Sequence, residues 1–145
     1  MIDRDPGLRA RRSAAATLIL AGREEDEAPV VRVRREPGYV LITVAGELDY
    51  GSVPALRERL LSLADDGRPL VADLDRVSFI DAAGLGMLAA AARRAAAHGA
   101  SLRVVCAGHR IRRLFGLTGL DRAVPLAERL ADALPGTAGA EATAV

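Results

Sequence analysis

One stretch of the sequence limits the choice of fold more than any other. Residues 39–45, Tyr-Val-Leu-Ile-Thr-Val-Ala, form a nearly continuous β-prone apolar run. A strand with one face in water alternates apolar and polar residues, and this run does not alternate. It therefore predicts a strand buried on both faces, which is typical of the interior of an α/β sheet.

The rest of the chain alternates between strand-like and helix-like segments, which favours parallel pairing with right-handed crossovers. The first two strands are close enough in sequence to form a hairpin, so the sheet should be mixed. We predict an α/β fold with a mixed, mostly parallel sheet of about four to five strands and about four helices packed mainly on one face. Strands are expected at residues 30–33, 39–45, 70–74, 102–106 and 124–126, and helices after Ser52 and at residues 82–97, 111–116 and 127–134.

Two helix starts carry recognisable capping residues. Ser52 is the expected N-cap of the first helix, and Asp81 the expected N-cap of the second. The apolar spacing of the second helix predicts that a stripe faces the sheet. Met87 falls on the opposite side of that stripe, so we expect it to be an exposed, adaptable contact. The stripe consists of Leu85, Leu88, Ala89, Ala92 and Ala96.

Composition shifts divide the chain into one domain and two tails. Residues 1–29 pass from an Arg-rich start through an Ala-rich patch to an acidic run, and we expect a mobile N-terminal extension. Residues 30–135 should form the folded domain. Residues 136–145 are rich in Gly, Ala and Thr and should form a disordered C-terminal tail.

Charge and aromatic content weigh against several classes of partner. Aromatic residues make up 3% of the chain and the net charge is +1. A base-stacking binder needs aromatic platforms, and a phosphate binder needs an electropositive face, so direct nucleic-acid binding is not expected. No apolar run reaches the length of a membrane span. A single cysteine, Cys106, fits a reducing cytoplasm.

Catalysis, metal binding and cofactor binding are likewise not expected. The chain has no nucleophile–base pair and no phosphate-binding loop motif, so we expect no enzyme and no cofactor. His98 and His109 lack metal-ligand spacing, and one cysteine cannot build a thiolate site.

Three local motifs, in order and at compatible spacing, resemble the STAS domain family, and within it the bacterial anti-sigma-factor antagonists. The resemblance covers residues 30–135, so the expected domain is a single STAS domain. The motifs are Ala-Gly-Glu-Leu-Asp at residues 45–49, Val-Ser-Phe-Ile-Asp-Ala-Ala-Gly-Leu-Gly at residues 77–86, and Arg-Arg-Leu-Phe-Gly-Leu-Thr-Gly-Leu-Asp at residues 112–121.

The resemblance implies a function and a switch. Antagonists of this family bind a kinase-fold anti-sigma factor and so free a sigma factor, until the partner phosphorylates a serine at the start of the second helix. Here the position that matches this serine is Ala82, and its neighbour Ala83 also lacks a hydroxyl. We therefore expect an antagonist that cannot be phosphorylated at this site. The residues expected to contact the partner are Asp49, Asp81, Ala82, Ala83, Gly84, Gly86 and Met87.

Several alternatives remain open at this point. Another hydroxyl, on Ser78, Ser52 or Thr118, could replace the missing phosphoacceptor; we expect Ser78 to be partly buried and so a poor substitute. Asp81 could serve only as a helix cap, Asp49 only as a turn residue, and Gly84 and Gly86 only in tight packing. The chain could instead be a scaffold or transporter-associated STAS subunit that binds an ATPase or other STAS proteins. Self-association is compatible with either function.

Overall fold

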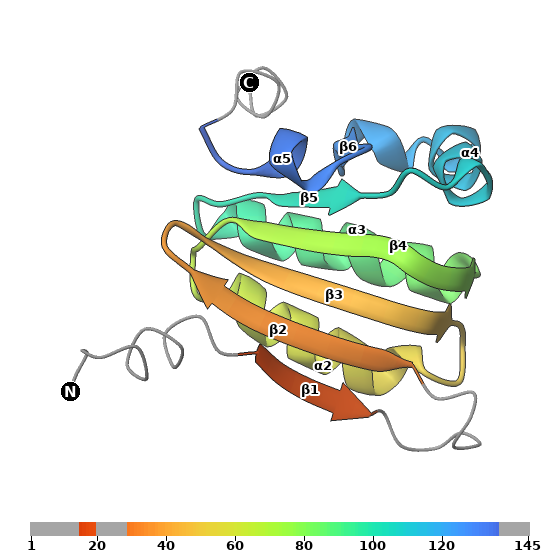
Figure 1. Cartoon of the computed structure of the whole chain (residues 1–145), viewed down its shortest axis with the longest axis horizontal. Helices are drawn as coiled ribbons and strands as arrows, with labels where there is room; N and C mark the ends of the chain where they lie inside the picture. Colours follow the sequence, from red (N-terminus) through yellow and green to blue (C-terminus); the bar gives the residue numbers. More distant parts are fainter. Residues whose placement is uncertain (1–14, 20–28, 137–145) are drawn as a thin grey trace.

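The computed structural model describes residues 15–19 and 29–136, and within them the predicted α/β fold is confirmed. A single mixed sheet has the strand order β1-β2-β3-β4-β5-β6 (Figure 1). The strands are β1 Ala15–Ile19, β2 Val30–Glu36, β3 Tyr39–Leu48, β4 Leu70–Ile80, β5 Leu102–Val105 and β6 Leu126–Ala127. The helices are α2 Val53–Ala64, α3 Ala82–Ala97, α4 His109–Thr118 and α5 Leu130–Ala133, with a short 3-10 turn, η2, at Leu120–Arg122.

The pairing pattern explains why the sheet is mixed. β2 and β3 form the expected antiparallel hairpin, and β3, β4, β5 and β6 run parallel to one another. β1 pairs antiparallel with β2 and lies within the segment expected to be an extension, so it adds a strand outside the predicted domain. The mobility expected for residues 1–29 and 136–145 stays a prediction. Residues 1–14, 20–28 and 137–145 lie outside the described part.

Two strands extend well past the apolar runs that predicted them. β4 continues beyond Leu74 through Asp75 and Arg76 to Ile80, and β3 continues to Leu48. Their pairing carries register shifts between Thr43 and Ala45 and between Gly46 and Glu47. A bulge of this kind lets a strand continue while its polar residues turn outward. Charged residues therefore did not mark the end of the strand.

The helices lie mainly on one face of the sheet, as expected. α2 and α3 run side by side behind the sheet in Figure 1, and the main core lies between them and β2–β5. The opposite face holds a much smaller buried cluster beneath α5: Leu41, Val71, Val105 and Ala133. α5 is shorter than predicted, whereas α4 extends two residues beyond Gly116 and ends at Gly119, whose φ of 76° is the left-handed cap.

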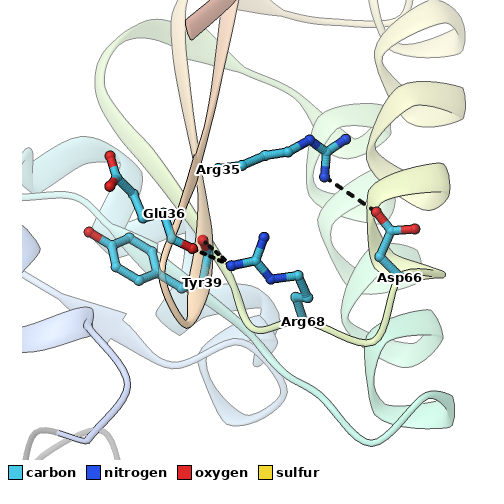
Figure 2. A network of polar contacts seen from close by, with 5 residues as sticks. All are labelled: Arg35, Glu36, Tyr39, Asp66 and Arg68. Carbon is cyan, nitrogen blue, oxygen red and sulfur yellow. Dashed lines mark hydrogen bonds and ion pairs between the residues drawn. The ribbon is translucent and has the colours of Figure 1, made fainter. Parts of the chain in front are cut away.

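The tip of the β2–β3 hairpin is fixed to the segment that joins α2 to β4. Figure 2 shows the Arg68 guanidinium donating to the backbone carbonyls of Glu36 and Tyr39, on either side of the hairpin turn. On the same side, Arg35 Nη1 lies 3.4 Å from Asp66 Oδ2. These contacts hold the hairpin against the helical layer at one end of the sheet, and the opposite end carries the predicted site.

Candidate functional site

The predicted contact residues lie at the end of the sheet where the parallel strands finish. Figure 1 shows the arrowheads of β3, β4 and β5 at this same end. The β3–α2 loop and the start of α3 follow two neighbouring strands, so the topology brings them together. We call this surface the α3 edge and define it as Asp49, Tyr50, Phe79, Asp81, Ala82, Ala83 and Gly86.

Asp81 is the residue that joins the two segments of the α3 edge. Its Oδ1 accepts hydrogen bonds from the backbone N–H groups of Ala83, at 2.9 Å, and Gly84, at 3.1 Å. Its Oδ2 accepts from the N–H of Tyr50, at 3.1 Å, in the β3–α2 loop. The predicted N-cap is confirmed. One carboxylate thus caps α3 and also ties the neighbouring loop to the start of that helix.

Asp49 and Ser52 hold the β3–α2 loop together through hydrogen bonds to each other. Ser52 is the N-cap residue of α2, as predicted, but its side chain makes no capping hydrogen bond. Its Oγ instead accepts from the N–H of Asp49, at 3.1 Å, and donates to the carbonyl of Glu47. Asp49 Oδ1 accepts from the N–H groups of Gly51, at 3.0 Å, and Ser52, at 3.2 Å. Asp49 therefore has the turn role, and a partner contact remains a prediction.

The two glycines of α3 differ in their surroundings. A Cβ on Gly84 would lie 2.6 Å from Ile80 Cγ1 and 2.9 Å from the carbonyl oxygen of Leu48. No side chain fits there, so Gly84 is buried against the ends of β3 and β4 and cannot present a surface. A Cβ on Gly86 would meet nothing within 4 Å. Gly86 is exposed, and packing does not require a glycine at that position.

Met87 is a core residue, which overturns the prediction that it is an exposed contact. Its side chain is 2% exposed and packs in the main cluster with Leu88 and Ala91. Leu85, which was expected to be buried, is only partly buried. The buried stripe of α3 is rotated by one residue, because Gly84 allows the helix to approach the sheet along that side. The stripe consists of Gly84, Met87, Leu88, Ala91, Ala92 and Ala95.

The α3 edge also contains two exposed aromatic residues that sequence reasoning did not select. Tyr50 is 84% exposed and Phe79 is 44% exposed, and in the same two segments Ala82 is exposed and Ala83 half-buried. Large exposed apolar side chains next to small residues are typical of a protein-binding surface. An aromatic residue within the turn Asp49-Tyr50-Gly51 was the available signal for Tyr50, because buried aromatics rarely occupy a tight turn.

The three hydroxyls proposed as substitute phosphoacceptors differ in accessibility. Ser52 is 1% exposed and its hydroxyl is hydrogen-bonded. Thr118 is exposed, and its hydroxyl donates to the carbonyl of Leu114 at 2.8 Å. Ser78 was expected to be partly buried, but it is exposed, because the bulged β4 turns it outward next to Phe79. Ser78 therefore has the most accessible unbonded hydroxyl of the three.

The α3 edge as defined contains no cysteine or histidine, and the single cysteine of the chain, Cys106, is buried. Within residues 15–19 and 29–136, no group of three or more His, Cys, Asp or Glu side chains is placed to hold a metal ion. Burial raises the pKa of the Cys106 thiol, which keeps it protonated. In the described part of the chain, no helix is both long and apolar enough to cross a bilayer.

Comparison with known proteins gives a consistent result. A model of the STAS domain family matches residues 30–133. The anti-sigma-B factor antagonist of Bacillus subtilis (strain 168) is 33% identical over 99 residues, which cover 68% of this chain and 91% of that protein. The anti-sigma-B factor antagonist of Staphylococcus aureus (strain NCTC 8325 / PS 47) is 36% identical over 80 residues, covering 54% and 74% respectively.

A solved structure is also similar to this chain. It is the crystal structure of an anti-sigma factor antagonist from Mycobacterium paratuberculosis, with a TM-score of 0.68 and 34% sequence identity. The similarity covers 74% of this chain and 92% of that chain. The family match at residues 30–133 runs from β2 to α5 and so includes the α3 edge.

Proposed function

This chain belongs to the STAS domain family, and from this premise we propose that it is an anti-sigma-factor antagonist that binds through the α3 edge. On this proposal the partner is a kinase-fold anti-sigma factor, and binding releases a sigma factor in the cytoplasm. The protein acts by occupying its partner and catalyses no reaction. Two relatives that this chain matches over 91% and 92% of their length are named as anti-sigma factor antagonists, which supports this role.

The observation that carries the proposal is the link made by Asp81. It holds Tyr50 beside the first turn of α3, with bonds of 3.1 Å to Tyr50 N and 2.9 Å to Ala83 N. This arrangement holds the backbone of Tyr50, whose side chain is exposed, at the start of the helix that carries the small exposed residues Ala82 and Gly86. A surface organised before binding loses little conformational entropy on association, which favours affinity.

We further propose that the partner cannot switch this protein off at the start of α3. Ala82 is the first residue of α3 and is exposed, but a methyl group offers no oxygen to a phosphoryl donor. The fold itself would accept negative charge there, because the free N–H groups and the dipole of a helix N-terminus stabilise anions. A charge at position 82 should therefore act on the partner and leave the fold intact.

A capture experiment with three baits tests the proposal. Wild type, Ala82→Asp and Ala82→Asn are used to retain proteins from a lysate of the source cell, with ATP present, and the retained proteins are identified by mass spectrometry. Asp and Asn have nearly the same size, so their difference isolates the charge. We expect an anti-sigma factor on the wild-type and Asn baits and a loss of about tenfold or more on the Asp bait, as for an unpaired charge in an interface.

Two results would overturn the proposal. Capture of a transporter ATPase or of other STAS proteins, with no anti-sigma factor, would assign the chain to the scaffold class. Equal capture by the Asp and Asn baits would place the interface away from the start of α3. Exposed Ser78 serves as a further check. Incubation of the captured complex with ATP should leave Ser78 unmodified if the antagonist binds its partner continuously.

A further inference from the structure

Helix α4 presents an exposed stripe that the fold does not use. Ile111 and Phe115 are buried and fix the inner side of the helix. Arg110, Arg113 and Leu117 lie at spacings of three and four residues along the outer side, and all three are exposed. Leu117 is 72% exposed and is one of three large apolar side chains that are exposed among the described residues. We call Arg110, Arg113 and Leu117 the α4 stripe.

The two arginines of the α4 stripe are uncompensated. Neither Arg110 nor Arg113 has an ion pair or a side-chain hydrogen bond within the described part of the chain. The first turn of α4 contains no acidic residue. Asp75 is the acid placed at the loop before α4, where its Oδ1 accepts from Ala107 N at 2.8 Å. In the described residues, no ion pair joins this carboxylate to either guanidinium group.

The position of these charges is unfavourable for the helix itself. Arg110 is the second residue of α4, whose N-cap, Gly108, offers no side-chain acceptor. A cation near a helix N-terminus opposes the macrodipole, where an acidic residue would stabilise. The sequence therefore accepts an electrostatic cost at the start of the helix and exposes a leucine on the same side about two turns further on. Such conflicts between local preference and fold concentrate at functional surfaces.

The start of the α4 stripe lies at the same end of the sheet as the α3 edge. α4 follows β5 just as α3 follows β4, and these two strands are parallel neighbours. The starts of both helices therefore lie at the same end of the sheet, and Figure 1 places α4 beyond the arrowhead of β5. A partner that covers the start of α3 and extends along this end would next meet Arg110.

We propose that the α4 stripe is a second contact surface for the same protein partner, whose facing region is acidic and contains an apolar pocket for Leu117. This inference rests on the proposed function, because it assigns further chemistry to that partner. Complementary charge mainly raises the rate of association and selects the partner, whereas a buried apolar side chain mainly slows dissociation. Substitution of an arginine of the α4 stripe should therefore change mainly the association rate, and substitution of Leu117 mainly the dissociation rate.

Binding kinetics of the full chain with the captured anti-sigma factor test the inference. The variants are Arg110→Glu, Leu117→Ser and, as the matched control, Arg93→Glu on the exposed side of α3. We expect Arg110→Glu to lower the association rate about tenfold at low salt, with a smaller effect at high salt. Leu117→Ser should raise the dissociation rate, and the control should change neither rate by more than about twofold.

A stability measurement shows whether Arg110→Glu weakens binding by damaging the fold. An acidic residue near the start of α4 suits the macrodipole, so Arg110→Glu should unfold at an equal or higher urea concentration than wild type while it binds more weakly. Association rates that are equal for Arg110→Glu and Arg93→Glu would overturn the inference. A dimer of this chain that dissociates on Arg110→Glu would also overturn it, because the stripe would then belong to a second copy.

The Ala82→Asp variant, measured in the same assay, distinguishes a failure of the α4 inference from a failure of the proposed function. If Ala82→Asp weakens binding and the α4 variants do not, the α4 inference fails and the proposed function stands. If the anti-sigma factor binds neither wild type nor any variant, the proposed function fails.

Discussion

Asp81 should be the residue at the α3 edge whose loss costs the most stability. Its carboxylate accepts three backbone hydrogen bonds, from Ala83 and Gly84 in α3 and from Tyr50 in the preceding loop. Loss of an N-cap costs about 1 kcal/mol, and loss of a further exposed hydrogen bond about 0.5–1.5 kcal/mol. We expect Asp81→Ala to lower the free energy of unfolding by about 2 kcal/mol, a factor of about 30 in the unfolding equilibrium.

Asp81→Asn separates the two parts of this effect. The amide oxygen can still accept from α3, but the amide nitrogen would face the N–H of Tyr50, so the loop contact is lost. We expect a cost of about 1 kcal/mol, half of the alanine effect. Urea denaturation measures both variants, with exposed Glu58→Ala as a control that should stay within about 0.5 kcal/mol of wild type. A cost for Asp81→Ala no larger than that of the control would refute the reasoning.

Three further predictions concern α3 and its end. Gly84→Ala should destabilise by about 1–3 kcal/mol through overpacking, whereas Gly86→Ala should stabilise by up to about 1 kcal/mol; urea midpoints that move in the same direction would contradict this. Met87→Ala should cost about 2–5 kcal/mol in the same assay, and a cost near zero would mean that Met87 is a surface residue. Arg94 donates to Asp65 at 2.9 Å and holds the pKa of that carboxyl below its usual 3.8. Ionised Asp65 stabilises the fold above its usual pKa of 3.8, and this gain is lost as the pH falls through the lowered pKa of the folded state. Arg94→Gln should therefore be less stable than wild type at neutral pH, and the difference should disappear once Asp65 is protonated in both proteins. A difference that persists in acid would contradict this assignment.

The sequence predicts elements well where a local signal acts alone. Asp81 and Gly99 mark the two ends of α3, and the helix runs over Ala82–Ala97 as expected. The buried side of that helix was misassigned, because a segment so rich in Ala and Gly has little contrast between its faces. Only the close approach at Gly84, where a Cβ would lie 2.9 Å from the carbonyl oxygen of Leu48, determines the rotation. That contact depends on tertiary structure.

The hydrogen bonds of the candidate site likewise depend on tertiary structure that the sequence does not reveal. Asp49 and Ser52 are both good capping residues, and the loop backbone determines which oxygen reaches which N–H. Only Tyr50, through its place in a turn, could have been recognised as exposed from the sequence; Phe79 could not, because an aromatic residue next to an apolar run is usually assigned to the core. Phe79 becomes exposed only because bulges carry β4 past its apolar run.

Release of a sigma factor is the measurement that tests the account most directly. The purified chain is titrated into a preformed complex of the captured anti-sigma factor and its sigma factor, with ATP, and free sigma factor is measured over time. The account predicts release in proportion to the added chain, with the same extent in ATP as in a non-hydrolysable analogue, because Ala82 cannot accept a phosphate. The absence of release, or release that is lost as ATP is consumed, would contradict it.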